Sequence, residues 1–210
     1  LKGASPRILL KAPTGSGKST GIPPMMDDAG LGENGLIVVV QPRRMAARLL
    51  ARHVARLRGS ELGREVGYMV RFERHISSRT RIAYVTDGVL ERWLTDRPCL
   101  EGVSAVVFDE FHERSLSGDL SLGRVLDLQE GPRPDLAVVV MSATLEMSGL
   151  REYMGESCRE LEACGRKYTV EITYRPSRPV SDGRGRVALP SVWDQAAAAV
   201  REAVKDAACG

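Results

Sequence analysis

Small residues followed by a lysine and two hydroxyl groups stand near the start of the chain, directly after an apolar stretch. The segment consists of Thr14, Gly15, Ser16, Gly17, Lys18, Ser19 and Thr20. Glycines let backbone N–H groups converge on a phosphate, lysine neutralises phosphate oxygens, and a serine hydroxyl can bind Mg²⁺. Ala12 stands where the usual pattern has glycine. We predict a nucleotide-phosphate loop with Lys18 also acting in catalysis, rather than a glycine-rich turn that binds nothing.

Two carboxylates follow another apolar stretch. Asp109 and Glu110 come directly after the run 103–108, and His112 stands two residues further on. A buried parallel strand delivers such groups at its carboxyl end, where ligands bind in α/β proteins. Asp109 is expected to hold Mg²⁺, and Glu110 to polarise an attacking water as a general base. Either acid alone could be a strand-end cap, but the predicted lysine in the same sheet favours a shared site.

Short runs rich in valine and isoleucine supply the elements that would position these groups. The runs cover residues 7–11, 35–41, 81–86, 103–109 and 135–142. They are almost continuously apolar, as in parallel strands covered by helices on both faces. Helical patterns cover residues 87–94 and 119–128 and the segment after Arg44. We predict an α/β fold with a central, mostly parallel sheet and helices on both faces.

The helix expected after Arg44 carries two kinds of residue. Its apolar face is predicted to hold Ala46, Leu49, Leu50, Val54 and Leu57, and a second face Arg48, Arg52 and Arg56. Residues 41–92 hold twelve arginines and five acidic residues, a net charge of +7, whereas the whole chain has +3. This segment either faces nucleic-acid phosphates or is an ordinary solvated surface, and the sequence leaves both open.

Composition and the positions of predicted breaks in the chain indicate the class of protein and its domain boundaries. A hydrophobic content of 43% with 27% charged residues excludes a disordered chain, and no apolar run approaches the roughly 20 residues of a membrane span. Scattered cysteines without a Cys-x-x-Cys pair argue against a zinc site and against a disulfide framework. The chain begins at Leu1 without a signal segment, so we expect a fragment of a longer, cytoplasmic protein. We expect one domain over 1–175, with an edge strand at 168–174, a linker over 176–190 and, over 191–210, a helix opening a truncated second domain.

Five motifs in order carry a resemblance to a known family. They cover residues 15–20, 41–44, 86–88, 109–114 and 142–144. Together they resemble the first RecA-like motor domain of superfamily 2 helicases of the DEAH/RHA type, over roughly residues 5–180. Phe111 replaces the alanine of the Asp-Glu-Ala-His box, and with the following segment 113–116 this variant is most similar to the bacterial HrpB-like helicases.

The resemblance implies a function for each motif. It implies hydrolysis of ATP with Mg²⁺, driving translocation on single-stranded nucleic acid, without a membrane partner. The resemblance favours RNA over DNA as this strand, and the sequence itself leaves both open. His112 would bridge the nucleotide and other motifs as a catalytic residue. Residues implied in nucleic-acid contact are Pro42, Arg43, Arg44, Thr86, Asp87 and Gly88, and those implied in coupling are Ser142, Ala143 and Thr144. Thr86 or Asp87 could equally cap the next helix.

Two further expectations rest on the same resemblance. His53 occupies the position at which relatives stack an arginine on the nucleotide base, although a core-edge histidine is the simpler interpretation. The family's Gln-x-x-Gly-Arg-x-Gly-Arg segment is absent, so arginine fingers would come from a second motor domain of the same chain. This fragment should therefore bind nucleotide but hydrolyse it slowly. A nucleotide-sensing module without unwinding activity and a P-loop kinase are the alternative functions.

Overall fold

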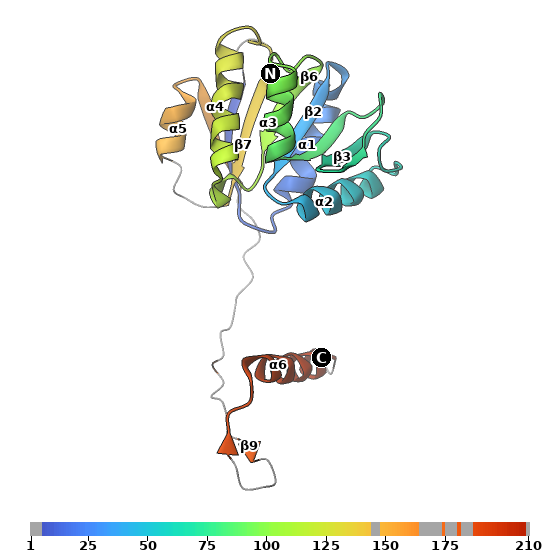
Figure 1. The fold of residues 1–210 in the computed structure, drawn as a ribbon, viewed down its shortest axis with the longest axis vertical. Helices are drawn as coiled ribbons and strands as arrows, with labels where there is room; N and C mark the ends of the chain where they lie inside the picture. Colours follow the sequence, from blue (N-terminus) through green and yellow to red (C-terminus); the bar gives the residue numbers. More distant parts are fainter. Residues whose placement is uncertain (1–5, 144–147, 164–173, 175–179, 182–186, 209–210) are drawn as a thin grey trace. The chain divides into compact units, whose positions relative to one another are not determined.

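Apolar strands alternate with helices along the chain, and eight of the strands form one sheet (Figure 1). The computed structural model describes residues 6–143, 148–163, 174, 180–181 and 187–208. The strand order is β4-β3-β5-β2-β6-β7-β1-β8, and every neighbouring pair is parallel except β3 and β4. This confirms the predicted α/β class with a mostly parallel sheet.

The sheet strands are β1 (Arg7–Lys11), β2 (Leu36–Gln41), β3 (Val66–Val70), β4 (Glu73–His75), β5 (Ile82–Thr86), β6 (Val103–Phe108), β7 (Ala137–Ser142) and β8 (Cys158–Glu162). The helices of this part are α1 (Lys18–Asp28), α2 (Arg44–Leu57), α3 (Asp87–Asp96), α4 (Leu116–Glu130) and α5 (Ser148–Met154). Two short 3₁₀ turns cover Leu31–Glu33 and Phe111–Glu113.

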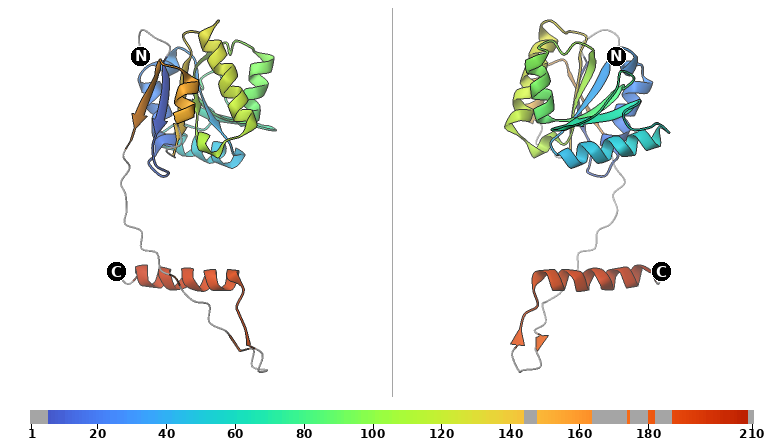
Figure 2. Two further views of the ribbon diagram at one scale, coloured as in Figure 1. Left: turned by 90° about the vertical axis from the view of Figure 1, so that its left-hand side faces the viewer. Right: turned by 45° about the vertical axis from the view of Figure 1, so that its right-hand side comes forward.

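Helices cover both faces of the sheet (Figure 2). Residues of α1 and α2 pack in one hydrophobic cluster, and residues of α3, α4 and α5 pack in the other, on the opposite face. All residues of β6 and β7 are buried. A strand covered on both sides needs apolar side chains at every position, which explains the continuous runs in the sequence.

The structure corrects the predicted core face of α2. The buried residues are Ala47, Ala51, Val54 and Ala55, whereas Leu49 and Leu57 are 57% and 66% exposed. Alanines let the helix axis approach the sheet closely, so Leu49 and Leu57 lie on the outer side, whereas Leu50 is partly buried against the core as predicted. Periodicity alone could not separate these two overlapping stripes, because both repeat at helical spacing.

Other differences concern three further strands, β3, β4 and β8, which were not predicted. The edge strands β4 and β8 are mostly polar and exposed, whereas β3 is buried at four of its five positions and its apolar run is interrupted by Gly67. The expected edge strand at 168–174 lies outside the described residues except for Tyr174, which belongs to neither a helix nor a strand.

The chain divides into two compact units, residues 1–166 and 167–210. In the second unit, β9 (Val180–Ser181) pairs with β10 (Val187–Ala188), and α6 (Val192–Ala208) follows. Trp193 and Val200 of α6 are exposed. Within the described part of the chain, no helix is both long and apolar enough to cross a membrane.

Candidate nucleotide-binding site and nucleic-acid interface

The glycine-rich loop connects β1 to α1 at the carboxyl edge of the sheet. Gly15 and Gly17 have φ angles of 75° and 83°, in the left-handed region that favours glycine. Gly17 leads directly into the first turn of α1, and Thr14 and Ser16 are exposed on the loop. Backbone N–H groups at a helix start form a site for phosphate. The neighbouring Ala12 is only 1% exposed, so its methyl group packs inside and leaves the loop free.

An ion pair between a buried lysine and a partly exposed glutamate joins this loop to the predicted carboxylates. Lys18 Nζ lies 2.9 Å from Glu110 Oε1, and the lysine side chain is 3% exposed. Lys18 begins α1, whereas Glu110 follows β6, so the two come from segments far apart in the sequence. The sheet therefore brings the two chemical motifs into direct contact.

Asp109 is held more deeply at the end of β6. Its carboxylate accepts hydrogen bonds from Gln41 Nε2 at 2.6 Å and from the Glu110 N–H at 2.9 Å. The Ser19 hydroxyl also forms a hydrogen bond with it. The residue is 3% exposed, and this burial raises the pKa of the Asp109 carboxyl above its ordinary value, although the hydrogen bonds oppose the rise.

Gln41 was not among the predicted site residues. It is 1% exposed and ends β2 with a polar side chain after five apolar residues. A buried polar residue at the carboxyl end of an apolar strand needs a hydrogen-bond partner. That break in an apolar run is the sequence signal that could have identified it.

Glu110 also faces His112 and the end of β7. Its φ of 49° turns the chain directly after β6 and precedes the short 3₁₀ turn. His112 Nδ1 lies 3.3 Å from Glu110 Oε2 and 3.5 Å from the backbone nitrogen of Ala143. The Ala143 N–H can donate to this nitrogen only when Nδ1 carries no proton, whereas a protonated Nδ1 can donate to Glu110. The His112 imidazole therefore lies next to both Glu110 and the predicted coupling residue Ala143.

The coupling residues follow the same strand. Ser142 is buried, and its carbonyl accepts a hydrogen bond of 3.0 Å from the Ala12 N–H at the start of the phosphate loop. Thr144 lies outside the described residues. Thr20, at the other end of the loop, donates from its hydroxyl to the Gly17 carbonyl at 3.1 Å.

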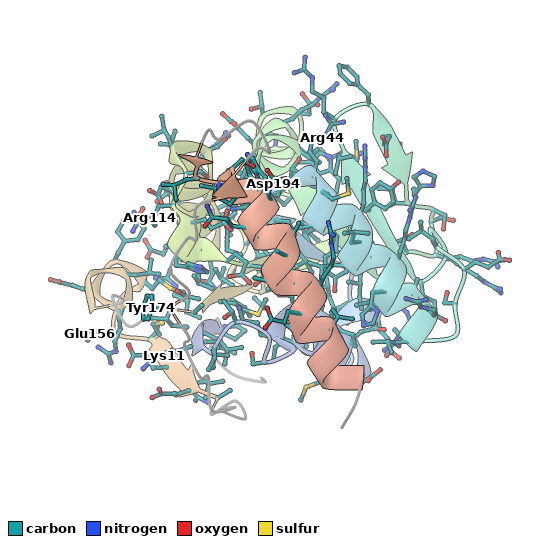
Figure 3. All side chains as sticks on the ribbon, turned by 90° about the horizontal axis from the view of Figure 1, so that it is seen from below. Lys11, Arg44, Arg114, Glu156, Tyr174 and Asp194 are labelled. Carbon is teal, nitrogen blue, oxygen red and sulfur yellow. The ribbon has the colours of Figure 1, made fainter. Side chains whose placement is uncertain are left out.

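The residues expected to contact nucleic acid lie at the ends of two neighbouring strands. Gln41 of β2 pairs in register with Thr86 of β5, so the segments 42–44 and 86–88 emerge side by side. Arg43 and Arg44 are exposed. Figure 3 looks at the carboxyl edge, where Arg44 and Arg114 are labelled.

Asp87 has a structural partner of its own. Its carboxylate accepts a hydrogen bond from Ser115 Oγ at 2.8 Å, and Ser115 in turn caps α4 by accepting the Gly118 N–H at 2.9 Å. Burial raises the pKa of Asp87. Thr86 is the N-cap residue of α3 by position but makes no side-chain capping bond. Gly88 adjoins them in the first turn of α3.

His53 does not lie at the edge of the core. It is exposed on α2, on the side of Leu49 and Leu57. Within the described ranges, no hydrogen bond or ion pair joins His53 to the phosphate loop. The core-edge interpretation is therefore wrong, and a contact with the nucleotide base stays a prediction.

These features define a class of protein. A parallel sheet with a glycine-rich loop after β1, a lysine at the helix start and a carboxylate pair on a nearby strand is the arrangement of a P-loop NTPase domain of the RecA-like type. The described geometry places every catalytic candidate on one edge of the sheet.

Comparison with known proteins identifies the family. The DEAD/DEAH box helicase family matches residues 2–153, and the chain belongs to this family. It is 44% identical over 172 residues to the ATP-dependent RNA helicase HrpB of Escherichia coli, covering 82% of this chain and 21% of that protein. The ATP-dependent RNA helicase HrpA of Escherichia coli is 36% identical over 187 residues, covering 89% of this chain and 14% of that protein.

A solved structure gives the same result for the fold. The crystal structure of the Escherichia coli DEAH/RHA helicase HrpB matches with a TM-score of 0.74 and 43% sequence identity, over 82% of this chain and 22% of that one. The chain thus spans about a fifth of the length of HrpB and less of HrpA.

Proposed function

We propose that this chain is the ATP-binding motor domain of a nucleic-acid helicase that acts on RNA rather than DNA. The observation that carries the proposal is the Lys18–Glu110 ion pair of 2.9 Å, because it joins the phosphate loop to the proposed hydrolytic carboxylate. RNA is favoured because HrpB and HrpA are both named RNA helicases. A cytoplasmic location stays an expectation from the sequence.

Each of the site residues would have a separate role in ATP hydrolysis. Backbone N–H groups of residues 14–20 and the Lys18 ammonium would hold the phosphates, and Glu110 would orient the attacking water and accept its proton. Ser19 and Asp109 fit a Mg²⁺ site, because a hydroxyl and a buried carboxylate already adjoin there. Bound Mg²⁺ would neutralise charge developing on the phosphate oxygens. His112 would report the state of Glu110 to the segment after β7.

Nucleic acid would bind across the ends of β2 and β5. Arg43 and Arg44 offer exposed guanidinium groups, and the start of α2 offers backbone N–H groups, both suited to phosphate. The neighbouring turn 86–88 would contact the same strand through its backbone, since the Asp87 carboxylate is bonded to Ser115. Such contacts do not read base identity, as a translocating motor requires.

A second motor domain would complete the active site. We propose domain 1–175, linker 176–190, and a helix from 191 that begins this second domain and leads toward its arginine fingers. The greater length of HrpB and the exposed apolar side chains of α6 support this proposal.

The test is ATP hydrolysis by the full-length protein with and without single-stranded RNA or DNA. RNA should raise the rate more than DNA, and Glu110→Gln should lower it about 10²- to 10⁴-fold while ATP binding is retained. Glu156→Gln, an exposed glutamate outside the site, is the matched control and should hydrolyse normally. Binding of ATP and RNA without stimulated hydrolysis would instead identify a nucleotide-sensing module.

A further inference from the structure

Helix α1 contains two prolines directly after the phosphate loop, Pro23 and Pro24. In an α-helix the carbonyl of residue i accepts the N–H of residue i+4, and proline has no N–H. The carbonyl of Ser19 therefore cannot receive its usual helical hydrogen bond. A carbonyl in this partly buried place needs a donor from elsewhere.

Tyr84 supplies that donor. Its hydroxyl donates to the Ser19 carbonyl oxygen at 2.8 Å. Tyr84 lies in β5 with 0% of its surface exposed, so the ring is fixed by the surrounding core. Burial, with a smaller contribution from the Asp109 charge, raises the pKa of the Tyr84 hydroxyl, which stays protonated and can act as a donor at every physiological pH.

Ser19 is thereby held at two points. Its carbonyl is fixed by Tyr84 and its hydroxyl by Asp109. The hydroxyl is the group that fits Mg²⁺ in the proposed function. A shift of the first turn of α1 would move this ligand away from Asp109, so the Tyr84 bond sets the geometry of the metal site.

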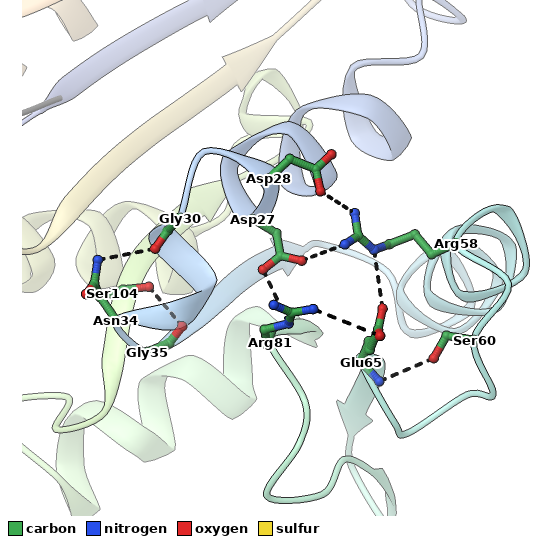
Figure 4. A network of polar contacts seen from close by, with 10 residues as sticks. All are labelled: Asp27, Asp28, Gly30, Asn34, Gly35, Arg58, Ser60, Glu65, Arg81 and Ser104. Atoms are coloured by element: carbon green, nitrogen blue, oxygen red, sulfur yellow. Dashed lines mark hydrogen bonds and ion pairs between the residues drawn. The ribbon is translucent and has the colours of Figure 1, made fainter.

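The same strand reaches the proposed nucleic-acid contact. Tyr84 is separated from Thr86, the last residue of β5, by one residue. The opposite end of α1 is also fixed near β5, because Asp27 pairs with Arg58 at 2.9 Å and with Arg81 at 3.5 Å (Figure 4). Arg81 directly precedes β5. Helix α1 is thus attached at both ends to the segment that leads into the turn 86–88.

We propose that Tyr84 is a positioning residue that replaces the amide missing at Pro23 and mechanically joins the nucleic-acid turn 86–88 to the metal ligand Ser19. This inference rests on the proposed function and states how the nucleic-acid contact is coupled to the nucleotide site. Nucleic acid that shifts the end of β5 displaces the Tyr84 hydroxyl, and the Ser19 carbonyl follows it.

Tyr84→Phe removes the hydroxyl and keeps the ring. In the full-length protein, the Mg²⁺ concentration required for half-maximal ATP binding should rise about threefold to tenfold, the range of one neutral hydrogen bond. ATP binding in EDTA should stay unchanged. Tyr68→Phe is the matched control, because Tyr68 is equally buried in the same sheet but donates to Glu73 at 3.2 Å, away from the loop.

Pro23→Ala in the Tyr84→Phe background separates the two parts of the proposal. Alanine restores the N–H that can bond to the Ser19 carbonyl, so the Mg²⁺ requirement should return to within about twofold of the parent protein. RNA should stimulate hydrolysis less in Tyr84→Phe than in the parent protein, and this stimulation should remain reduced in the double variant, because the connection to β5 is still missing. If Tyr84→Phe alone fails to fold, the double variant, with its restored bond, still provides both measurements.

Three results would overturn the inference. An unchanged Mg²⁺ requirement in Tyr84→Phe, or a loss that Pro23→Ala does not reverse, would show that the hydroxyl does not position Ser19. RNA stimulation fully restored in the double variant would exclude the link through β5. In each case the parent protein would still show RNA-stimulated hydrolysis, whereas its absence in the parent would reject the proposed function as well.

Discussion

At the level of single residues, the site concentrates charged groups that the fold has removed from water. Lys18 and Asp109 are both nearly inaccessible, and each has partners from other segments of the chain. Glu110 adopts a left-handed backbone conformation, which costs about 1 kcal/mol or more for a residue with a side chain. Such an arrangement is retained where a function needs it, since a buried charge does not by itself stabilise a fold.

Asp109 should make stability depend on pH. Because burial raises its pKa, the folded state binds more protons than the unfolded state above the ordinary pKa of an aspartate, and stability falls as pH rises. Asp109→Asn should therefore gain free energy of unfolding relative to the parent, by a difference that grows as the pH rises from about 4, the ordinary pKa of an aspartate, to the raised pKa of the folded state. Urea denaturation across this range measures the difference, and Mg²⁺-dependent ATP binding should fall about tenfold to hundredfold.

Asp135→Asn provides a control in which the pH dependence of stability should have the opposite sign. A hydrogen bond from Arg133 lowers the pKa of the Asp135 carboxyl. Asp135→Asn should lose stability at neutral pH, and this loss should disappear as the pH falls toward the lowered pKa. Equal pH profiles for the two variants would contradict the assignment of Asp109 as a buried, destabilising charge.

At the level of elements, neighbouring parallel strands determine which motifs meet. The carboxyl ends of β2, β5, β6, β7 and β1 all lie at one edge, so the turns that follow them converge. The paired ends of β2 and β5 bring the two proposed nucleic-acid segments together, and β6 brings its carboxylates to the phosphate loop. Helix α1 is held against this framework at both ends.

Removal of Arg58 should test how firmly the far end of α1 is attached. Arg58 pairs with buried Asp27, with Asp28 at 2.9 Å and with Glu65 at 3.6 Å. Arg58→Met should lower the free energy of unfolding by about 2 kcal/mol, less than for an isolated buried pair because Arg81 remains near Asp27.

The control for this experiment is an arginine in an exposed pair. Arg92 lies 3.2 Å from Asp96 within α3, and both side chains are mostly exposed. Arg92→Met should cost less than about 0.5 kcal/mol in the same urea titration. Similar losses for the two variants would mean that the Asp27 network adds no more than a surface pair.

At the level of the whole molecule, the first unit holds all the proposed nucleotide contacts but spans about a fifth of HrpB. An arginine finger is worth about 10³- to 10⁵-fold in the rate of phosphoryl transfer. This chain alone should therefore bind ATP, yet hydrolyse it at least about 10³-fold more slowly than the full-length protein with RNA. Single-turnover hydrolysis of labelled ATP measures both rates, and equal rates would show that no second domain is needed.

The sequence by itself determined the chemistry and most of the central sheet. The glycine-lysine loop and the paired acids could be recognised because phosphate binding needs particular residue types at fixed spacing. The five continuous apolar runs predicted β1, β2, β5, β6 and β7, since a strand buried on both faces leaves no polar position.

Only the tertiary structure decided which of these groups touch. The 2.9 Å contact of Lys18 with Glu110, the bond from Gln41 to Asp109 and the bond from Tyr84 to Ser19 each join residues more than 60 positions apart. Strand order and register create those contacts, and neither is encoded in local spacing. The core face of α2 and the short edge strands were likewise set by how closely neighbouring elements pack, which a pattern along one chain segment does not contain.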